Sequence, residues 1–239
     1  MLDKIKKLIK CLSVNVWRAP LKHGVAAATE HDFFFRNYSF DTVVDIGANK
    51  GQFSLVMKKN FPMASILAFE PLRQPFLTYS KIFEGDRCVK IFNSAIAPNI
   101  GVVDINVSKS CDSSSLLEIS DLQNEIFPGT SAIGSENITS GPLDSFVSKE
   151  EIKGVSLLKL DVQGFELEAL HGCNALLGLF DMVYCECSFM ELYKGQALAP
   201  EIIEFMAKEG FVLQGFNNVA YSKNGTTIQA DFIFCRVKK

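Results

Sequence analysis

The stretch TVVDIGANKGQF, from Thr42 to Phe53, changes character at its midpoint. Its first five residues are β-branched or apolar except for Asp45, which predicts a buried strand. Gly47 and Gly51 then bracket a short loop, and an apolar run with helical spacing follows. A strand, a glycine-containing loop and a helix in this order are typical of a unit that places a ligand beyond the carboxyl end of a parallel strand.

The same alternation of short apolar strands and helical patterns continues on the C-terminal side of this stretch. The further predicted strands have the sequences SILAFE (65–70), CVKIFNSAIA (88–97), VSLLKLD (155–161), DMVYCEC (181–187), FVLQGF (211–216) and TTIQADFIFCRV (226–237). The predicted helices between them cover residues 51–61, 75–83, 165–177 and 200–210. This βαβ rhythm predicts a mostly parallel sheet with helices on both faces. The turn signal Asn224-Gly225 predicts that the last strand is antiparallel.

Residues 98–150 interrupt this rhythm. GVVDINVS (101–108) predicts a short strand, whereas KSCDSSS (109–115) and PGTSAIGSENITSGP (128–142) are rich in Ser, Gly and Asn and predict loops. Because this segment lies between the third and fourth parallel strands, we expect it to form inserted loops on the substrate side of one domain, residues 41–239.

Bulk composition excludes several classes of protein. A chain of 239 residues with a formal net charge of −3 is ordinary for a globular enzyme and argues against nucleic acid as a partner. Its seven cysteines are odd in number and scattered, so we expect reduced thiols and a cytoplasmic location.

The N-terminal segment, residues 1–40, begins with MLDKIKKLIKCLSV, in which lysines alternate with apolar residues at helical spacing. It contains no apolar run long enough for a signal peptide or a membrane span. We expect an amphipathic helix packed on the domain. The alternative is peripheral contact of this basic helix with an anionic membrane surface.

Two acids mark the ends of the first two predicted strands. Glu70 follows Asp45 by 25 positions, and the loop between Gly47 and Gly51 lacks the middle glycine of the GxGxxG pattern that accommodates a pyrophosphate. Buried carboxylates repel phosphate and suit a cationic ligand that donates hydrogen bonds. S-adenosylmethionine has an ammonium, a sulfonium and a ribose diol and no phosphate, so it fits this pair of acids.

Four motifs, VVDIGANKGQFS, ILAFEPL, LLKLDVQGFELEALHG and CECSFMELYKGQAL, together resemble the FkbM family of class I S-adenosylmethionine-dependent methyltransferases. They look most like the subgroup with a DVQG motif and an LYxGQ segment, and the resemblance runs from about Asp41 to Arg236. It implies an α/β, Rossmann-like fold with a seven-stranded, mostly parallel sheet and an antiparallel last strand. It also implies O-methylation, commonly of a sugar hydroxyl in a glycan, glycolipid or glycosylated natural product.

The resemblance also implies roles for individual residues. Matching positions for the cofactor are Asp45, Gly47, Ala48, Asn49, Gly51, Glu70, Pro71, Ser94 and Ala95. Asp161, at the end of the fourth parallel strand, matches the acid that faces the transferred methyl group.

Methyl transfer to a hydroxyl requires a group that accepts its proton, and Asp161 is our candidate for this base. Lys159, on the same face of the strand, could orient that carboxylate or pair with a nearby acid for stability. A divalent cation held by Asp161 with Glu186 or Asp144 is an alternative, although the chemistry does not require a metal.

A small-molecule or glycan acceptor is the expected partner, and four residues are candidates for contacting it. These are Glu186, Ser114, Ser115 and Tyr193. The competing interpretations are a surface acid for Glu186, solvated loop hydroxyls for the serines and packing for Tyr193. The lone histidines His23 and His31 are weaker candidates for the base. For the whole chain, the rivals to a methyltransferase are a nicotinamide-dependent oxidoreductase on a related fold and an inactive binding module.

Overall fold

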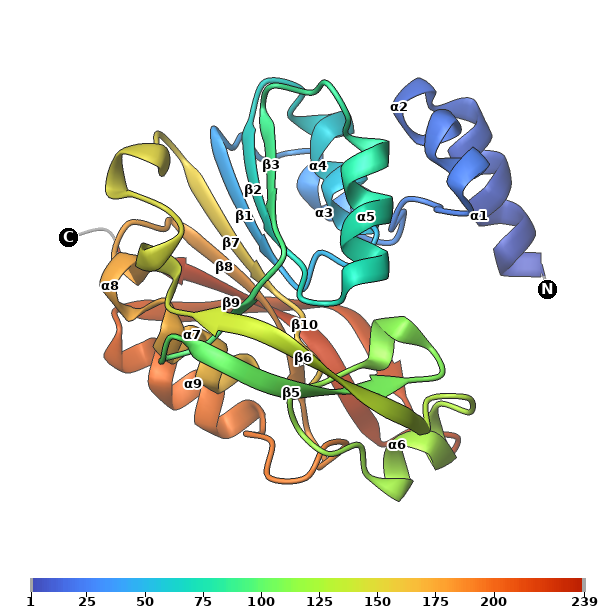
Figure 1. The fold of residues 1–239 in the computed structure, drawn as a ribbon, viewed down its shortest axis with the longest axis vertical. Helices are drawn as coiled ribbons and strands as arrows, with labels where there is room; N and C mark the ends of the chain where they lie inside the picture. Colours follow the sequence, from blue (N-terminus) through green and yellow to red (C-terminus); the bar gives the residue numbers. More distant parts are fainter. Residues whose placement is uncertain (1, 238–239) are drawn as a thin grey trace.

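A seven-stranded sheet forms the centre of the fold (Figure 1). The computed structural model describes residues 2–237. The strands lie in the order β3-β2-β1-β7-β8-β10-β9, and β10 is antiparallel to both of its neighbours while the other adjacent pairs are parallel. Their bounds are Thr42–Ile46 (β1), Ser65–Phe69 (β2), Val89–Phe92 (β3), Ser156–Leu160 (β7), Met182–Ser188 (β8), Phe211–Tyr221 (β9) and Thr227–Arg236 (β10). The predicted sheet with an antiparallel last strand is confirmed.

Helices cover both faces of this sheet because its central strands are apolar on both sides. Val43 of β1 packs in one hydrophobic cluster with Met57 of α4, whereas Val44 packs in a second cluster with Leu170 of α7 and Met206 of α9. Successive side chains of a strand point to opposite faces, so one strand contributes to both clusters. The helices are α4 (Gln52–Asn60) and α5 (Arg73–Ile82) on the first face, and α7 (Glu166–Gly172), α8 (Asn174–Leu177) and α9 (Ala199–Lys208) on the second.

The expectation of inserted loops between residues 98 and 150 is wrong in part, because a second, three-stranded sheet forms there. Its order is β4-β6-β5, with bounds Ala95–Ile96, Ala132–Gly141 and Gly101–Ser108 for β4, β6 and β5. β6 falls within the Ser/Gly-rich stretch predicted to be a loop, and it pairs antiparallel with β5 along its length. Most of β6 is exposed, so its sequence lacks the alternation of apolar residues that marks a half-buried strand. Short elements complete the segment: η2 (Cys111–Ser113), α6 (Asp121–Ile126), η3 (Leu143–Ser145) and η4 (Lys149–Glu151).

Three element boundaries also differ from prediction. The third strand ends at Phe92, and the following residues cross to the second sheet as β4. The helix predicted over 165–177 is divided at Cys173 into α7 and α8. β9 extends to Tyr221, because residues beyond Phe216 pair with β10 up to the turn at Asn224-Gly225.

The N-terminal segment forms α1 (Leu2–Ser13), α2 (Asn15–Arg18), η1 (Ala19–His23) and α3 (Asp32–Phe35), and it lies on the α4 side of the sheet (Figure 1). Cys11, Trp17 and Phe35 are fully buried in the hydrophobic cluster that α4 also joins. The indole N–H of Trp17 donates to the carbonyl of Leu55 at 2.8 Å. Within residues 2–237, the structure contains no helix with both the length and the apolar character needed to cross a bilayer.

Asp32 joins the helices of this segment to α4. Its carboxylate is 1% exposed and accepts hydrogen bonds from Lys59 and Arg36, both at 2.7 Å, while Lys10 of α1 lies at 3.3 Å. Burial raises the pKa of Asp32, but these cations and the Asn60 amide outweigh burial and lower the pKa below its usual value. The carboxylate therefore contributes stability above its unfolded pKa of about 4 and loses that contribution as the pH falls.

We expect Asp32→Asn to lower the free energy of unfolding by about 1–3 kcal/mol, because the amide disrupts charged hydrogen bonds at a buried position. Urea unfolding followed by the emission of Trp17, the only tryptophan of the chain, measures this loss. Glu30→Gln is the matched control, since it breaks the exposed Lys7–Glu30 pair and should cost less than about 1 kcal/mol. Equal losses in the two variants would contradict this role of Asp32.

Candidate functional site

A pocket with a volume of about 300 Å³ opens beyond the carboxyl ends of β1, β2 and β7. Gly47, Glu70 and Asp161 follow these three strands and line it. Ile105 of the second sheet and His31 of the N-terminal segment line it as well. The position matches the rule that ligands of open parallel sheets bind beyond the carboxyl ends of the strands.

The loop from Gly47 to Gly51 uses its backbone N–H groups within the protein. The amides of Gly47 and Ala48 both donate to the carbonyl of Phe69, at 3.0 and 2.9 Å. The remaining three amides, those of residues 49, 50 and 51, donate to Glu70 Oε2, Gln52 Oε1 and the carbonyl of Ala48. Five consecutive amides are therefore occupied, and the loop does not present the row of free N–H donors that cradles a phosphate.

Gly47 is required by the close approach of β7 to this loop. Its φ is +77°, and a Cβ atom built there would lie 1.9 Å from the carbonyl oxygen of Asp161. Neither the dihedral angle nor the space allows another side chain without displacement of the backbone. The two strand ends that carry the pocket are thus packed directly against each other.

Glu70 forms part of the pocket wall beside the loop. Its two carboxylate oxygens each accept one backbone N–H bond at 2.8 Å, from Asn49 and from Leu72. The side chain is 5% exposed, and its burial raises the pKa to about 7 despite those N–H bonds and the charge of Lys159. Each oxygen retains a lone pair, so the ionised carboxylate can still accept hydroxyl groups of a ligand.

An apolar part of the pocket lies next to Glu70. Leu72, Ala95 and Ile105 form one hydrophobic cluster, against which Leu116 packs. Ile105 belongs to the second sheet, so the segment between β4 and β7 covers this part of the pocket. A flat apolar ring could be held between these side chains, whereas the neighbouring carboxylate supplies polarity at one edge.

Lys159 lies between the buried Asp45 and the pocket residue Asp161. Its ammonium lies 3.2 Å from Asp45 and 3.8 Å from Asp161, and it donates to the carbonyl of Gly47 at 2.9 Å. Burial opposes the charge of Lys159, but the two carboxylates outweigh it and raise the pKa. Lys159 therefore stays protonated, pairs with Asp45 and holds the glycine loop through the carbonyl of Gly47. Orientation of Asp161 by Lys159 stays a prediction.

Asp45 lies behind the pocket wall, not on it. Its side chain is fully buried, accepts a hydrogen bond from Ser54 of α4 at 2.7 Å and does not line the pocket. Tyr79 of α5 donates in turn to Ser54 at 2.9 Å. This placement corrects the expectation that Asp45 contacts a cationic ligand directly. One oxygen of its carboxylate pairs with Lys159, and the other accepts the hydrogen bond from Ser54.

Gln163 is a pocket residue that the sequence interpretation missed. Its side-chain amide donates to Asp161 at 2.7 Å and to Glu186 at 3.2 Å, and its carbonyl accepts the hydroxyl of Tyr193 at 2.6 Å. Its φ of +57° is rare for a residue other than glycine. The only signal in the sequence was its place in the DVQG motif.

The same network corrects two of the four expected substrate contacts. Tyr193 is 2% exposed, packs against Gly164 and does not line the pocket, so it has no face available for a sugar ring. Glu186 accepts bonds from Gln163 and from Gln229 at 2.6 Å, and it too lies outside the lining. Burial, together with Asp161 and Asp231, raises the pKa of Glu186 well above its usual value.

The two serines do line the pocket, but their hydroxyls already have partners. Ser115 is 1% exposed and donates to the carbonyl of Gln163 at 2.6 Å, while Ser114 accepts the amide of Ser108 at 3.0 Å. Ser115 thus fixes the loop after β7 and is not a free hydroxyl for a substrate.

The loop after β7 is held further by Glu166, which sequence reasoning did not single out. One of its oxygens accepts the amides of Val162 and Gly164, at 3.0 and 3.2 Å. Burial raises its pKa to about 7. The carboxylate thereby fixes the backbone that carries Asp161 and Gln163.

His31 brings an imidazole from the N-terminal segment to the pocket wall. Its Nδ1 lies 3.0 Å from the hydroxyl of Tyr184, 2.9 Å from the Asn218 amide and 3.5 Å from Asp231. Burial lowers the pKa of His31 although Asp231 acts in the opposite direction, so the neutral ring is favoured. His23 is exposed and does not line the pocket.

The structure thus brings most of the expected residues together. Those that line the pocket are Gly47, Ala48, Asn49, Glu70, Pro71, Ser94, Ala95, Ser114, Ser115, Lys159 and Asp161. Those that do not are Asp45, Gly51, Glu186 and Tyr193. Asp144, considered as a partner of Asp161 for a cation, is exposed in η3 and is also outside the lining. In the described part of the chain, no group of three or more His, Cys, Asp or Glu side chains is arranged to hold a metal ion.

The sequence matches a methyltransferase family and proteins that are named as methyltransferases. A family model described as the methyltransferase FkbM domain matches residues 45–213. The protein named 2-O-methyltransferase NoeI from Sinorhizobium fredii is 26% identical over 184 residues, which cover 72% of this chain and 73% of that protein. Methyltransferase 1 of Beauveria bassiana is 26% identical over 146 residues, which cover 55% of this chain and 58% of that relative, so the match spans little more than half of its length.

A solved structure from Clostridium thermocellum, named as an rRNA-methylase, superimposes with a TM-score of 0.51 and 8% sequence identity. The alignment covers 90% of this chain and 98% of that chain. At this level of identity the likeness concerns the fold alone.

Proposed function

Because this chain is a methyltransferase that belongs to the FkbM methyltransferase domain family, we propose that it transfers the methyl group of S-adenosylmethionine to a hydroxyl of a sugar. The acceptor would be a glycan, a glycolipid or a glycosylated natural product. One observation carries the choice of donor: the five loop amides are occupied internally while Glu70 retains acceptor capacity in the pocket wall.

The pocket residues fit this donor in charge as well as in hydrogen bonding. The acids Glu30, Glu70, Asp112 and Asp161 line the pocket, against only two lysines, Lys7 and Lys159. An excess of carboxylates favours a cationic ligand and disfavours a phosphate-bearing one. Glu70 would accept the ribose hydroxyls, and the apolar part around Leu72 would hold the adenine.

When bound, the donor supplies an electrophilic methyl group on a sulfonium. The protein's own residues must then position the acceptor in line with that methyl group and remove the acceptor's proton. Asp161 is suited to the second task, because its side chain is 40% exposed and fixed by Gln163 and Lys159. The carboxylate would take the hydroxyl proton as the new C–O bond forms and the methyl–sulfur bond of the donor breaks, which would leave a neutral thioether.

Two independent points support the acceptor, the first for an oxygen atom and the second for a sugar. The relative NoeI carries the name of a 2-O-methyltransferase, which names transfer to oxygen. Polar side chains also line the pocket, among them Gln52, Glu30 and Gln163. Polyhydroxylated ligands require such a density of donors and acceptors.

Isothermal titration of the purified protein with S-adenosylmethionine and, in parallel, with NAD tests the donor. We expect an affinity of about micromolar for the adenosyl donor. Tight binding of NAD with no binding of S-adenosylmethionine would overturn the proposal in favour of an oxidoreductase-type ligand. A panel of sugar acceptors with methyl-labelled donor then tests the acceptor, and methylation restricted to non-sugar hydroxyls would refute that part.

The affinity for S-adenosylmethionine should rise with pH through neutrality. Only ionised Glu70 can accept both ribose hydroxyls, and its pKa is raised to about 7. The ionised fraction then increases about tenfold between pH 6 and pH 8, so the dissociation constant should fall by about the same factor. Titrations across this pH range measure it.

Two variants test whether Glu70 is the group whose titration changes the affinity. Glu70→Gln should bind weakly and without a slope, because the titrating group is gone. Glu166, whose pKa is also about 7, titrates in the same range without lining the pocket, so Glu166→Gln should retain the slope. If the affinity still depended on pH in Glu70→Gln and no longer did so in Glu166→Gln, the titrating carboxylate would be Glu166. That result would contradict the proposed role of Glu70.

A further inference from the structure

The helix α1 contacts the rest of the protein through the side that bears Lys7, Lys10 and Cys11. Lys7 pairs with Glu30 at 3.0 Å, and Lys10 donates to the carbonyl of Thr29 at 2.9 Å. Cys11, one residue further on, is fully buried. Polar contacts and one small side chain therefore attach the helix, and its large apolar residues are not used for this purpose.

Those apolar residues form a stripe on the outer side of α1. Ile5, Leu8, Ile9 and Leu12 are 49%, 47%, 61% and 48% exposed. At about 100° per residue they fall within one sector of the helix, nearly opposite the sector that contains Lys7 and Cys11. We call these four residues the α1 stripe. Lys4 and Lys6, both exposed, lie on the two edges of the stripe.

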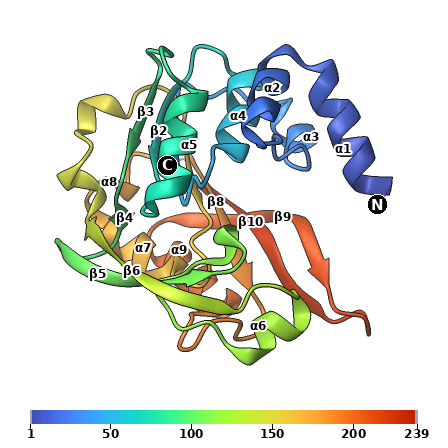
Figure 2. The same cartoon turned by 45° about the vertical axis from the view of Figure 1, so that its right-hand side comes forward.

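The shape and charge of this surface narrow down what could cover it. The helix projects at one side of the molecule (Figure 2), and the stripe is one helix wide. Residues 4–13 of α1 contain no acid, so a second copy paired through the same stripe would offer Lys4 and Lys6 no carboxylate. An anionic, deformable apolar layer satisfies both the exposed aliphatic side chains and the flanking ammonium groups.

We propose that the α1 stripe docks the protein on an anionic phospholipid bilayer. Ile5, Leu8, Ile9 and Leu12 enter the boundary between headgroups and acyl chains, and the helix lies in the plane of the membrane. Lys4 and Lys6 reach up to the phosphates on either side of the helix. Since Lys7 and Glu30 also line the pocket, the docked helix holds one side of the pocket close to the bilayer surface.

Flotation of the full chain with vesicles tests the proposal. Binding is expected to vesicles of phosphatidylcholine and phosphatidylglycerol in equal amounts, to be weak with phosphatidylcholine alone, and to decrease as salt is added. Ile5→Ser/Ile9→Ser should lower the partition coefficient by at least about tenfold, because it removes half of the aliphatic stripe. Lys4→Gln/Lys6→Gln should lower it by about tenfold on anionic vesicles.

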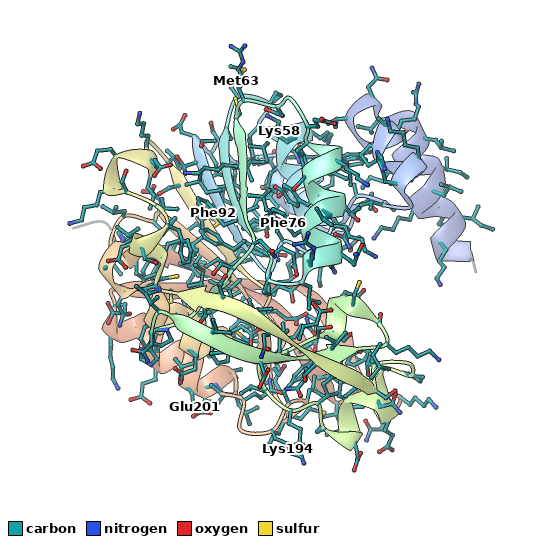
Figure 3. The ribbon with its side chains drawn as sticks, viewed as in Figure 1. Lys58, Met63, Phe76, Phe92, Lys194 and Glu201 are labelled. Atoms are coloured by element: carbon teal, nitrogen blue, oxygen red, sulfur yellow. The ribbon has the colours of Figure 1, made fainter. Side chains whose placement is uncertain are left out.

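Met63→Ser is the matched control. Met63 is an apolar side chain that is 84% exposed, in the turn before β2 and away from α1 (Figure 3), and this variant should partition like the unchanged protein. An unchanged Trp17 emission spectrum shows that the α1–α2 region of each variant remains folded.

Three results would overturn the proposal. They are no binding of the unchanged protein to anionic vesicles, equal binding by Ile5→Ser/Ile9→Ser, and a dimer in sedimentation velocity that Ile9→Ser converts to monomer. The last result would identify a second copy of the chain as the occupant of the stripe. None of these measurements depends on methyl transfer, so the docking surface and the proposed function can fail separately.

Discussion

Asp161→Asn is expected to lower turnover by about 10²–10⁴-fold while the affinity for S-adenosylmethionine changes little. The asparagine oxygen can still accept the bond from Gln163, so the loop after β7 keeps its position. What is lost is the carboxylate that takes the acceptor's proton. Steady-state kinetics with labelled donor, together with isothermal titration of the same preparation, separate the two effects.

Asp144→Asn is the control for this experiment, because Asp144 is exposed in η3 and does not line the pocket. It should leave both turnover and affinity unchanged. Unchanged turnover in Asp161→Asn would place the base elsewhere, and His31 would then be the next residue to replace. Loss of turnover in Asp144→Asn would revive the alternative of a cation held between the two acids.

Gly47→Ala is expected to abolish measurable binding of the donor, or to lower kcat/KM by more than about 100-fold. The added Cβ would meet the carbonyl oxygen of Asp161 at 1.9 Å, so β1 and β7 must separate at the point where the pocket begins. Displacements of about 1 Å at a reacting site can cost about 100-fold in rate. The melting temperature should fall as well, since a buried backbone contact is broken.

Gly85→Ala is the control that separates the steric effect of an added Cβ from the cost of a positive φ. Gly85 also has a positive φ, of +81°, but a Cβ built there meets nothing within 4 Å. The variant should cost about 1 kcal/mol in stability and leave binding intact. If Gly47→Ala behaved like Gly85→Ala, the close packing of the two strand ends would not be what shapes the site.

Much of the sheet could be predicted, because its strands are short apolar runs separated by glycine, proline and helical patterns. The pocket residue Glu70 could also be predicted, since it follows a strand end at the sheet edge where ligands bind. These features depend on local sequence and on a general rule of parallel sheets.

Asp45 shows where local sequence is insufficient. It lies one residue before the end of β1, so its side chain still points into the packed face beneath Ser54, whereas Glu70 comes just after the end of β2. A difference of two residues in position relative to the strand end separates a buried anchor from a pocket wall. Sequence patterns do not fix strand boundaries that closely.

Gln163, Glu186 and Tyr193 show a second reason for failure. Their interaction joins residues that are distant in sequence, and no single motif states which of the three faces the ligand. β6 was missed for a related reason, because its polar strand is stabilised by pairing with β5 and its own sequence has no apolar alternation.

A crystal structure of the protein with S-adenosylhomocysteine would test the proposed donor site. We expect both ribose hydroxyls to donate to Glu70 and the adenine to lie in the apolar part of the pocket formed by Leu72, Ala95 and Ile105. A ligand-free pocket at saturating concentration, or ribose hydroxyls bound away from Glu70, would contradict this expectation.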